Sequence, residues 1–248
     1  MPKAAFLIML LFNILILGTR FSFNVAGATN LRLFSSQTVV RFVPQFVRAY
    51  PNQTFAVTVL VENVTLLYGI DIQITWNTTY LKYQNHTATV PVETFANGIL
   101  HQPLFWVVNS VDENASMPNS EPETRYWIAV ASMYPAPVFN GNGTVFTTTF
   151  KALNKIGRTS LNFTNIELIN NRSKPISCIS FNCQVVITFP GDVNSDLKVD
   201  GKDIAFLAKA YNTQPGNPLW NPDADVNNDG KVDGKDIATA SKNYGKSA

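Results

Sequence analysis

DVNNDGKVDGKD, the stretch from Asp225 to Asp236, is a near copy of DVNSDLKVDGKD, the stretch from Asp192 to Asp203. The two copies lie 33 positions apart, and each places four aspartates within twelve residues. With no cation between them, these carboxylates would repel one another and oppose folding of the loop. The repeat therefore predicts that each loop encloses a divalent cation.

The spacing of the oxygen-bearing side chains identifies the cation. They stand at loop positions 1, 3, 5, 9 and 12, which is the ligand spacing of an EF-hand, where position 7 adds a backbone carbonyl. Calcium takes six to eight oxygen ligands, so Asp and Asn suit it whereas His and Cys do not. We therefore predict two calcium ions as cofactors. The predicted ligands are Asp192, Asn194, Asp196, Lys198 (through its carbonyl), Asp200 and Asp203 in the first loop, and Asp225, Asn227, Asp229, Lys231 (through its carbonyl), Asp233 and Asp236 in the second.

The two loops differ at position 6, where a sharp turn favours a positive φ angle. The second loop has Gly230 there, which adopts such an angle freely, whereas the first loop has Leu197. A left-handed Leu costs about 1 kcal/mol or more. We therefore expect the first loop to bind calcium more weakly than the second.

After each loop the apolar residues follow helical spacing, which predicts one amphipathic helix per loop. Before Pro190 the dominant period is two, and the change is abrupt, so we place a domain boundary at Pro190-Gly191 and a calcium-binding domain at 191–248. The residues that carry the helical pattern are Ile204, Leu207, Ala208 and Tyr211, then Ile237, Ala240 and Tyr244.

Residues 38–189 alternate apolar and polar side chains in short runs separated by turn signals, which is typical of strands. Ile70 to Trp76 alternates strictly, and Phe55, Val57, Val59 and Val61 share one face of the run before it. We expect the sequence Asn140 to Gly143 to form a turn. This many short strands predict a mainly β sandwich. The other expected strands are 39–43, 104–108, 126–133, 144–152, 160–168 and 184–189.

The N-terminal residues 1–28 are typical of a secretory signal peptide, because Lys3 precedes an apolar run from Ala4 to Leu17 and a small-x-small pattern follows at 26–28. The alternative is an uncleaved membrane anchor, for which the run is short. We therefore expect a secreted, extracellular or cell-surface protein. Eight Asn-x-Ser/Thr sites predict glycosylation and fit export. They are Asn52, Asn63, Asn77, Asn85, Asn114, Asn142, Asn162 and Asn171, all before the Asp-rich tail.

Two cysteines, Cys178 and Cys183, have four residues between them just before a predicted strand, and in an oxidising compartment they are expected to close a short hairpin disulfide. The alternative is two free thiols. The net charge of +2 with only 15% charged residues gives no basic field for nucleic acid. We also expect no membrane span in the mature chain, because no later segment is apolar enough.

The C-terminal tail, residues 191–248, resembles a dockerin, the calcium-dependent plug module of cellulosome-type assemblies. Two Asp-x-Asn-x-Asp loops that end in Asp, each running into a helix, with a Pro/Trp segment from Pro215 to Pro222 between them, carry this resemblance. It implies that loop positions 10 and 11 help to choose the partner. Here these are Gly201-Lys202 and Gly234-Lys235, identical in the two copies, which would allow docking in two orientations.

The β region resembles a cohesin, the receptor for dockerins and a relative of carbohydrate-binding modules, which implies a mainly β jelly-roll sandwich. The stretches 51–59, 63–71 and 141–150 carry this resemblance. Together the two resemblances imply a non-catalytic, calcium-dependent scaffold or adaptor protein of cellulosome-like type, linked to polysaccharide degradation. Its partners would be cohesin- or dockerin-bearing extracellular proteins, including a second copy of itself, head to tail.

Two other functions stay open on the sequence. A carbohydrate-binding module fused to a dockerin would use exposed, coplanar aromatic residues on one sheet face, chosen from Trp76, Trp106, Trp127, Tyr80 and Tyr83. A glycosidase would need two carboxylates that flank the bond, and no catalytic constellation is evident. A flat face of polar and aliphatic residues would instead favour protein docking, and we predict no enzyme activity.

Overall fold

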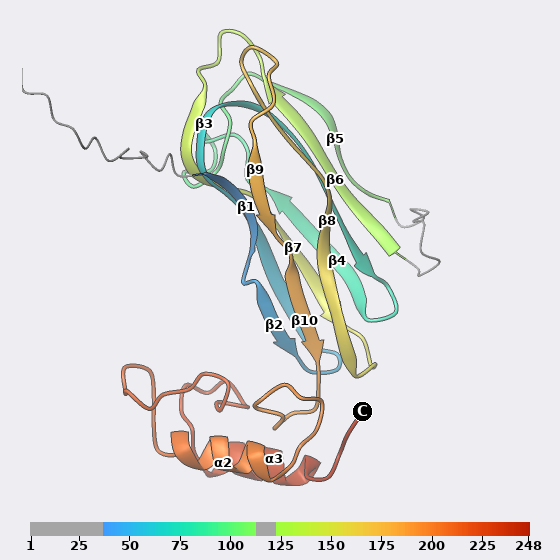
Figure 1. Cartoon of the computed structure of the whole chain (residues 1–248), viewed down its shortest axis with the longest axis vertical. Coiled ribbons are helices and arrows are strands. Elements are labelled where there is room, and N and C mark those ends of the chain that lie inside the picture. The colour runs from blue at the N-terminus through green and yellow to red at the C-terminus, as the bar shows by residue number, and fades with distance from the viewer. Residues whose placement is uncertain (1–36, 113–122) are drawn as a thin grey trace, which may run out of the picture. The chain divides into compact units, whose positions relative to one another are not determined.

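A computed structural model describes residues 37–112 and 123–248 (Figure 1). The predicted signal peptide and the glycosylation site at Asn114 lie outside these residues. Within them, every helix is too short or too polar to span a membrane.

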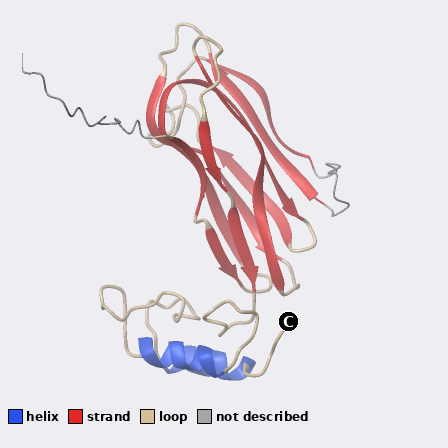
Figure 2. Ribbon diagram, in the orientation of Figure 1, coloured by secondary structure: helices blue, strands red, loops and turns tan. Residues whose placement is uncertain are grey.

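The described residues form strands up to Ile187 and helices after it (Figure 2). The two helices are α2 (Gly201–Ala210) and α3 (Gly234–Asn243). The strands are β1 (Thr38–Val43), β2 (Phe46–Ala49), β3 (Thr54–Asn77), β4 (Leu81–Ala88), β5 (Leu104–Asp112), β6 (Glu123–Ser132), β7 (Phe139–Ala152), β8 (Gly157–Asn170), β9 (Cys178–Phe181) and β10 (Cys183–Ile187).

The long strand β3 belongs to both layers of the sandwich. Its first part pairs with β1 and β7, and its last part pairs with β6 and β8. One layer therefore has the order β4-β7-β3-β1-β9, and the other has the order β5-β6-β3-β8-β10-β2 (Figure 1). The pairing between β3 and β7 shifts register near Asn63 and Leu66, whose φ angles of 54° and 58° are positive. These bulges bend the strand from one layer into the other. The prediction of a β-sandwich is confirmed.

The predicted turn at Asn140 to Gly143 is wrong, because these residues form the first part of β7 opposite the bulges of β3. The side-chain oxygen of Asn140 accepts a hydrogen bond from the amide of Leu66 at 2.8 Å. The side-chain oxygen of Asn142 accepts one from the amide of Asn63 at 2.7 Å. The two Asn residues, which are typical of a turn, here satisfy backbone amides at the bulges.

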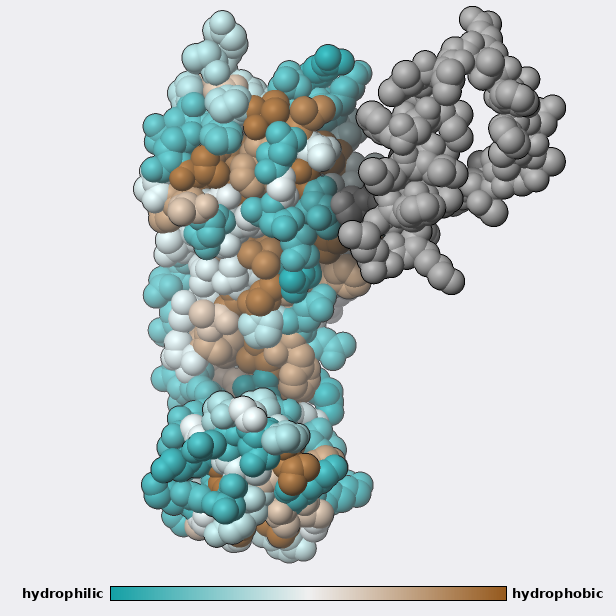
Figure 3. Space-filling model, turned by 90° about the vertical axis from the view of Figure 1, so that its left-hand side faces the viewer, coloured by the Kyte–Doolittle hydropathy of each residue, from teal (hydrophilic) through white to brown (hydrophobic). Residues whose placement is uncertain are grey.

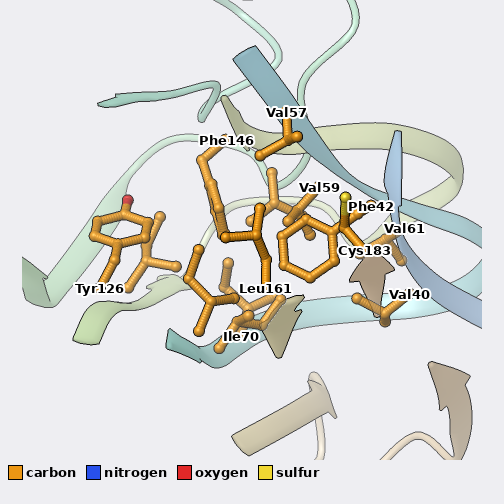
Figure 4. Packing of buried hydrophobic residues seen from close by; sticks show 14 of the residues in the cluster. Val40, Phe42, Val57, Val59, Val61, Ile70, Tyr126, Phe146, Leu161 and Cys183 are labelled. Carbon is orange, nitrogen blue, oxygen red and sulfur yellow. The ribbon is translucent and has the colours of Figure 1, made fainter. Parts of the chain in front are cut away.

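The core fills the space between the layers with the apolar residues that the alternation predicted. Val57, Val59 and Val61 point inward from one part of β3, and Ile70 points inward from the other (Figure 4). Phe146 from β7 packs among them. Its ring packs edge to face on that of Tyr126, with the two ring centroids 4.7 Å apart. Each fully buried side chain of this size stabilises the fold by roughly 1.5–3 kcal/mol.

The predicted hairpin disulfide is absent, since both Cys178 and Cys183 are free thiols. The two strands that carry them are not partners: β9 pairs with β1, and β10 pairs with β2 and β8. The chain therefore crosses from one layer to the other at Asn182 instead of turning back on itself. Burial raises the pKa of both thiols, that of Cys183 to about 12.

The tail has a small core of its own, which confirms the predicted amphipathic helices. Leu207 and Ala210 of α2 and Ala240 of α3 are buried, and Ile204 and Ile237 pack beside them. The helical spacing of apolar residues in the sequence, however, extends one residue beyond the end of each helix. Tyr211 and Tyr244 are the C-cap residues, with ψ angles of 140° and 132°, and both side chains are exposed.

Candidate metal centre

The first loop folds around its own carboxylates. Asp192 at position 1 accepts hydrogen bonds from the amides of Asp196 and Leu197, at 3.1 and 2.9 Å. Asp203 at position 12 reaches back across the loop and accepts from the amides of Val193 at 2.9 Å and Asp200 at 2.8 Å. The two ends of the loop are thereby closed on each other.

The second loop repeats this arrangement bond for bond. Asp225 accepts from the amides of Asp229 at 3.1 Å and Gly230 at 2.9 Å. Asp236 accepts from the amides of Val226 at 2.9 Å and Asp233 at 2.8 Å. Equal distances at an offset of 33 residues mean that the sequence repeat is also a structural repeat.

Position 9 of each loop starts the helix that follows. Asp200 and Asp233 are the N-caps of α2 and α3, and each accepts a hydrogen bond from the amide two residues on. The position-12 aspartates complete a capping box at each helix start. The same carboxylates therefore fix both the loop and the direction of the helix.

The backbone at position 6 is left-handed in both loops, as predicted. Leu197 has a φ angle of 72°, and Gly230 has one of 82°. No atom lies within 4 Å of the place where a Cβ would stand on Gly230, so a side chain there would meet only backbone strain.

The charge of the loops is poorly balanced by the protein. Asp192, Asp203 and Asp236 are fully buried, and Asp225 is nearly so. In residues 37–112 and 123–248, the one ion pair of a loop carboxylate is that of Asp229 with Lys235, at 3.3 Å. Burial raises the pKa of Asp192, and the nearby Asp203 adds to this. Buried carboxylates without basic partners favour a bound cation.

The donor set fits calcium by chemistry. Each loop offers three carboxylates and one Asn amide at its first, third, fifth and last positions, a set of hard oxygen donors. The residues that would hold an ion are those predicted from the spacing. In the described part of the chain, however, no three acidic, His or Cys side chains converge tightly enough to enclose a metal, so the ligand assignment stays a prediction.

The predicted partner-binding residues stand at the first turns of the two helices. Gly201 and Lys202 open α2, Gly234 and Lys235 open α3, and all four are exposed. A Cβ on either glycine would meet no atom within 4 Å. Neither glycine is therefore required for packing.

Comparison with known families assigns the tail. Residues 190–243 match the dockerin type I domain. The match spans both loops, both helices and the Pro/Trp segment, so the predicted C-terminal dockerin is confirmed. No curated protein matches the sequence of the chain.

Solved structures similar to this chain include cohesins. The sixth cohesin of scaffoldin B from Acetivibrio cellulolyticus, solved with a dockerin, has a TM-score of 0.44 and 12% identity, and the match covers 61% of this chain and 99% of that one. A non-cellulosomal cohesin from the archaeon Archaeoglobus fulgidus has a TM-score of 0.43 and 12% identity, and the match covers 61% of this chain and 91% of that one. A cohesin from Clostridium acetobutylicum has a TM-score of 0.43 and 13% identity, and the match covers 61% of this chain and 90% of that one.

Four of the five aromatic residues considered for sugar binding are not exposed. Trp76 is buried, and Tyr80 and Tyr83 pack against the core. Trp127 is half-buried, and its indole nitrogen donates to Asp71 at 2.8 Å. Of the five candidates, Trp106 on the edge strand β5 is the one exposed ring.

Sequence reasoning missed three residues that contact the first loop of the dockerin, of which Arg158 donates to the carbonyl of Ser195 at 2.6 Å. Thr188 is buried, and its hydroxyl donates to the carboxylate of Asp192. Arg48, which stands 144 residues before Asp192, donates to the carbonyl of Asp192. Thr188 stands four residues before Asp192 and could have been suspected as a local partner, whereas nothing in the sequence connects Arg48 with the loop.

Proposed function

We propose that this chain is a secreted, non-catalytic protein that assembles extracellular components in a calcium-dependent way. Its dockerin domain holds two calcium ions and plugs into a cohesin-type receptor. The observation that carries the proposal is the duplicated loop with buried carboxylates that lack basic partners among the described residues. Calcium would stabilise both loops and hold the two helices in place for docking.

The sandwich offers one face suited to a protein partner. On the layer that contains β6, β3 and β8, Gly69, Asp71, Ala129, Glu167 and Ile169 line a shallow hollow. Asp71 pairs in register with both Glu167 and Ala129, so these side chains share one side of the sheet. Small, aliphatic and acidic residues on a broad face suit a protein surface that carries basic residues.

Such basic residues stand on the dockerin itself. Lys202 and Lys235 are exposed at the starts of the two helices. We infer that the acidic face of one copy receives the dockerin of another, which would build head-to-tail chains. The identical residues at both helix starts would permit docking in either of two orientations.

Carbohydrate binding is the second candidate for the sandwich, and the placement of its aromatic rings disfavours it. On the face seen in Figure 3, apolar residues are interspersed with polar ones. The glycosylation sites fit a secreted protein, since none of the seven described acceptors is buried: Asn52, Asn63, Asn77, Asn85, Asn142, Asn162 and Asn171.

A capture experiment tests the proposal. The full chain is immobilised and challenged with a second, labelled copy and with proteins that bear cohesins or dockerins, in calcium and again in EGTA. We expect capture in calcium and release in EGTA. Capture that is insensitive to EGTA would contradict the calcium-dependent plug, and retention on insoluble polysaccharide alone would favour carbohydrate binding.

A charge exchange tests the acidic face. Glu167→Lys should weaken capture of a second copy, because it places a lysine opposite Lys202 and Lys235. Pairing this variant with a copy that carries Lys202→Glu and Lys235→Glu should restore capture. Failure of the exchange, with calcium-dependent capture otherwise intact, would place the receptor surface elsewhere.

A further inference from the structure

One arginine of the sandwich contacts the entries of both calcium loops. Arg48 lies on β2, and its side chain is 10% exposed. Its Nη1 donates to the carbonyls of Asp192 at 3.2 Å and Val193 at 2.6 Å, the first two residues of the first loop. Its Nη2 donates to the carbonyl of Asp223 at 3.2 Å and to the carboxylate of the same residue at 2.5 Å. Asp223 stands two residues before Asp225, which opens the second loop.

The planar fork of the guanidinium makes this bridge possible. Its five N–H donors point in fixed directions, so two acceptor groups that are far apart in sequence can be held at a set distance. A lysine ammonium is a single point and cannot reach both sides at once in the same geometry. The carboxylate of Asp223 also offsets the positive charge of Arg48, which reduces its repulsion of a calcium ion in the loops.

Two further contacts tie the sandwich to the first loop alone. The amide of Thr188 donates to the carbonyl of Ala49 on β2 at 3.0 Å, while its hydroxyl donates to the carboxylate of Asp192. Arg158, on β8, donates through Nη2 to the carbonyl of Ser195 at 2.6 Å. No corresponding contact is found at the second loop among the residues that the structure describes. Arg158 therefore provides a matched control for Arg48.

Apolar packing supports the same junction. Tyr50 follows β2 directly, and Phe189 follows β10. Both pack against the core of the dockerin domain, which includes Val193 and Val226 from the two loops. The end of the sandwich thus contributes side chains to the calcium-binding domain. That domain is small, and a small core stabilises a fold only marginally by itself.

From these contacts we propose that Arg48 is a positioning residue for calcium binding, which holds the entries of both loops in the geometry that the ions require. The proposal rests on the calcium sites of the proposed function and adds that the sandwich takes part in them. Calcium affinity then belongs to the full chain, because the loops are ordered partly by β2.

The test compares three variants of the full chain during a calcium titration followed by residue-resolved NMR. The amide signals at position 10 of each loop, those of Gly201 and Gly234, report the two affinities separately. Arg48→Met keeps the apolar stem and removes the fork, and we expect affinity to fall about tenfold at both sites, equivalent to about 1.4 kcal/mol. Arg158→Met should weaken the first site alone. Arg48→Lys should recover part of the loss.

The outcomes separate this inference from the proposed function. If the wild-type chain binds calcium and captures its partner but Arg48→Met binds both ions as tightly, the positioning role is refuted while the function stands. A wild-type chain that binds no calcium would refute both. If Arg48→Met lost the signals of the sandwich as well, the Arg48→Lys variant would decide: a folded lysine variant with unchanged affinity at both sites would also refute the role.

Discussion

Leu197 offers a direct measurement of how backbone strain limits a calcium site. Its φ angle of 72° is left-handed, as is that of Gly230 at the same position of the other loop. A left-handed conformation costs a residue with a Cβ about 1–2 kcal/mol. Glycine escapes this cost but loses about 0.5–1 kcal/mol through its greater freedom in the unfolded chain. The net advantage of glycine over alanine at either position is therefore about 0.5–1 kcal/mol.

The experiment replaces Leu197 by alanine and by glycine, and Gly230 by alanine. The alanine variant at 197 removes the half-buried side chain but keeps the strain, so the difference between alanine and glycine isolates the backbone. At Gly230 a Cβ has open space around it, which again leaves backbone strain as the main effect.

Because ordering of the loop accompanies ion binding, the free-energy difference between alanine and glycine at loop position 6 appears in the calcium affinity. Leu197→Gly should bind calcium at the first site about two- to fivefold more tightly than Leu197→Ala, by the conversion of 1.4 kcal/mol per tenfold. Gly230→Ala should weaken the second site by a similar factor. The NMR titration of the full chain measures each site. Equal affinities for the alanine and glycine variants at both positions would refute the reasoning.

Three further predictions follow from packing and exposure. Leu207→Ala, in the core of the dockerin domain, should cost about 2–5 kcal/mol and lower the thermal transition of that domain while the sandwich transition stays; a common shift of both transitions would contradict separate cores. Iodoacetamide at pH 8 should label Cys178 faster than the buried Cys183, whose pKa of about 12 leaves little thiolate; absence of labelling even in denaturant would indicate a disulfide. Gly201→Ser with Gly234→Ser should leave calcium affinity unchanged and alter partner capture, because both sites are open to solvent; weakened calcium binding would count against this.

Most strands that the sequence predicted have apolar residues that face the core on one side; the exception is β5, an edge strand without a fully buried residue. The three strands that the sequence did not predict are β2, β4 and β9, and all lie at sheet edges. In β4, Leu81 is the one fully buried residue, so alternation is too weak to detect. In β9, both Ile179 and Phe181 are exposed. An edge strand buries fewer side chains, and therefore its pattern carries less information about its structure.

The candidate site shows the same limit in another form. The ligand spacing within each loop is local, and it could be predicted because twelve consecutive residues determine it. The contact of Arg48 with Asp192 spans 144 residues and depends on the pairing of β2 with β10. No period in the sequence reports such a contact. It follows from topology, which brings β2 beside the strand that leads into the first loop.

The two loops are nearly identical in sequence but not in surroundings, and this affects how their affinities should be compared. The first loop carries the strain of Leu197, yet it alone receives hydrogen bonds from Thr188 and Arg158. A hydrogen bond contributes about 0.5–1.5 kcal/mol, so these two are large enough to offset the strain. The affinity difference expected from Leu197 alone is therefore reduced in the full chain. Since exchanging alanine for glycine at position 197 leaves both sandwich contacts in place, that exchange measures the strain more directly than a comparison of the two wild-type sites.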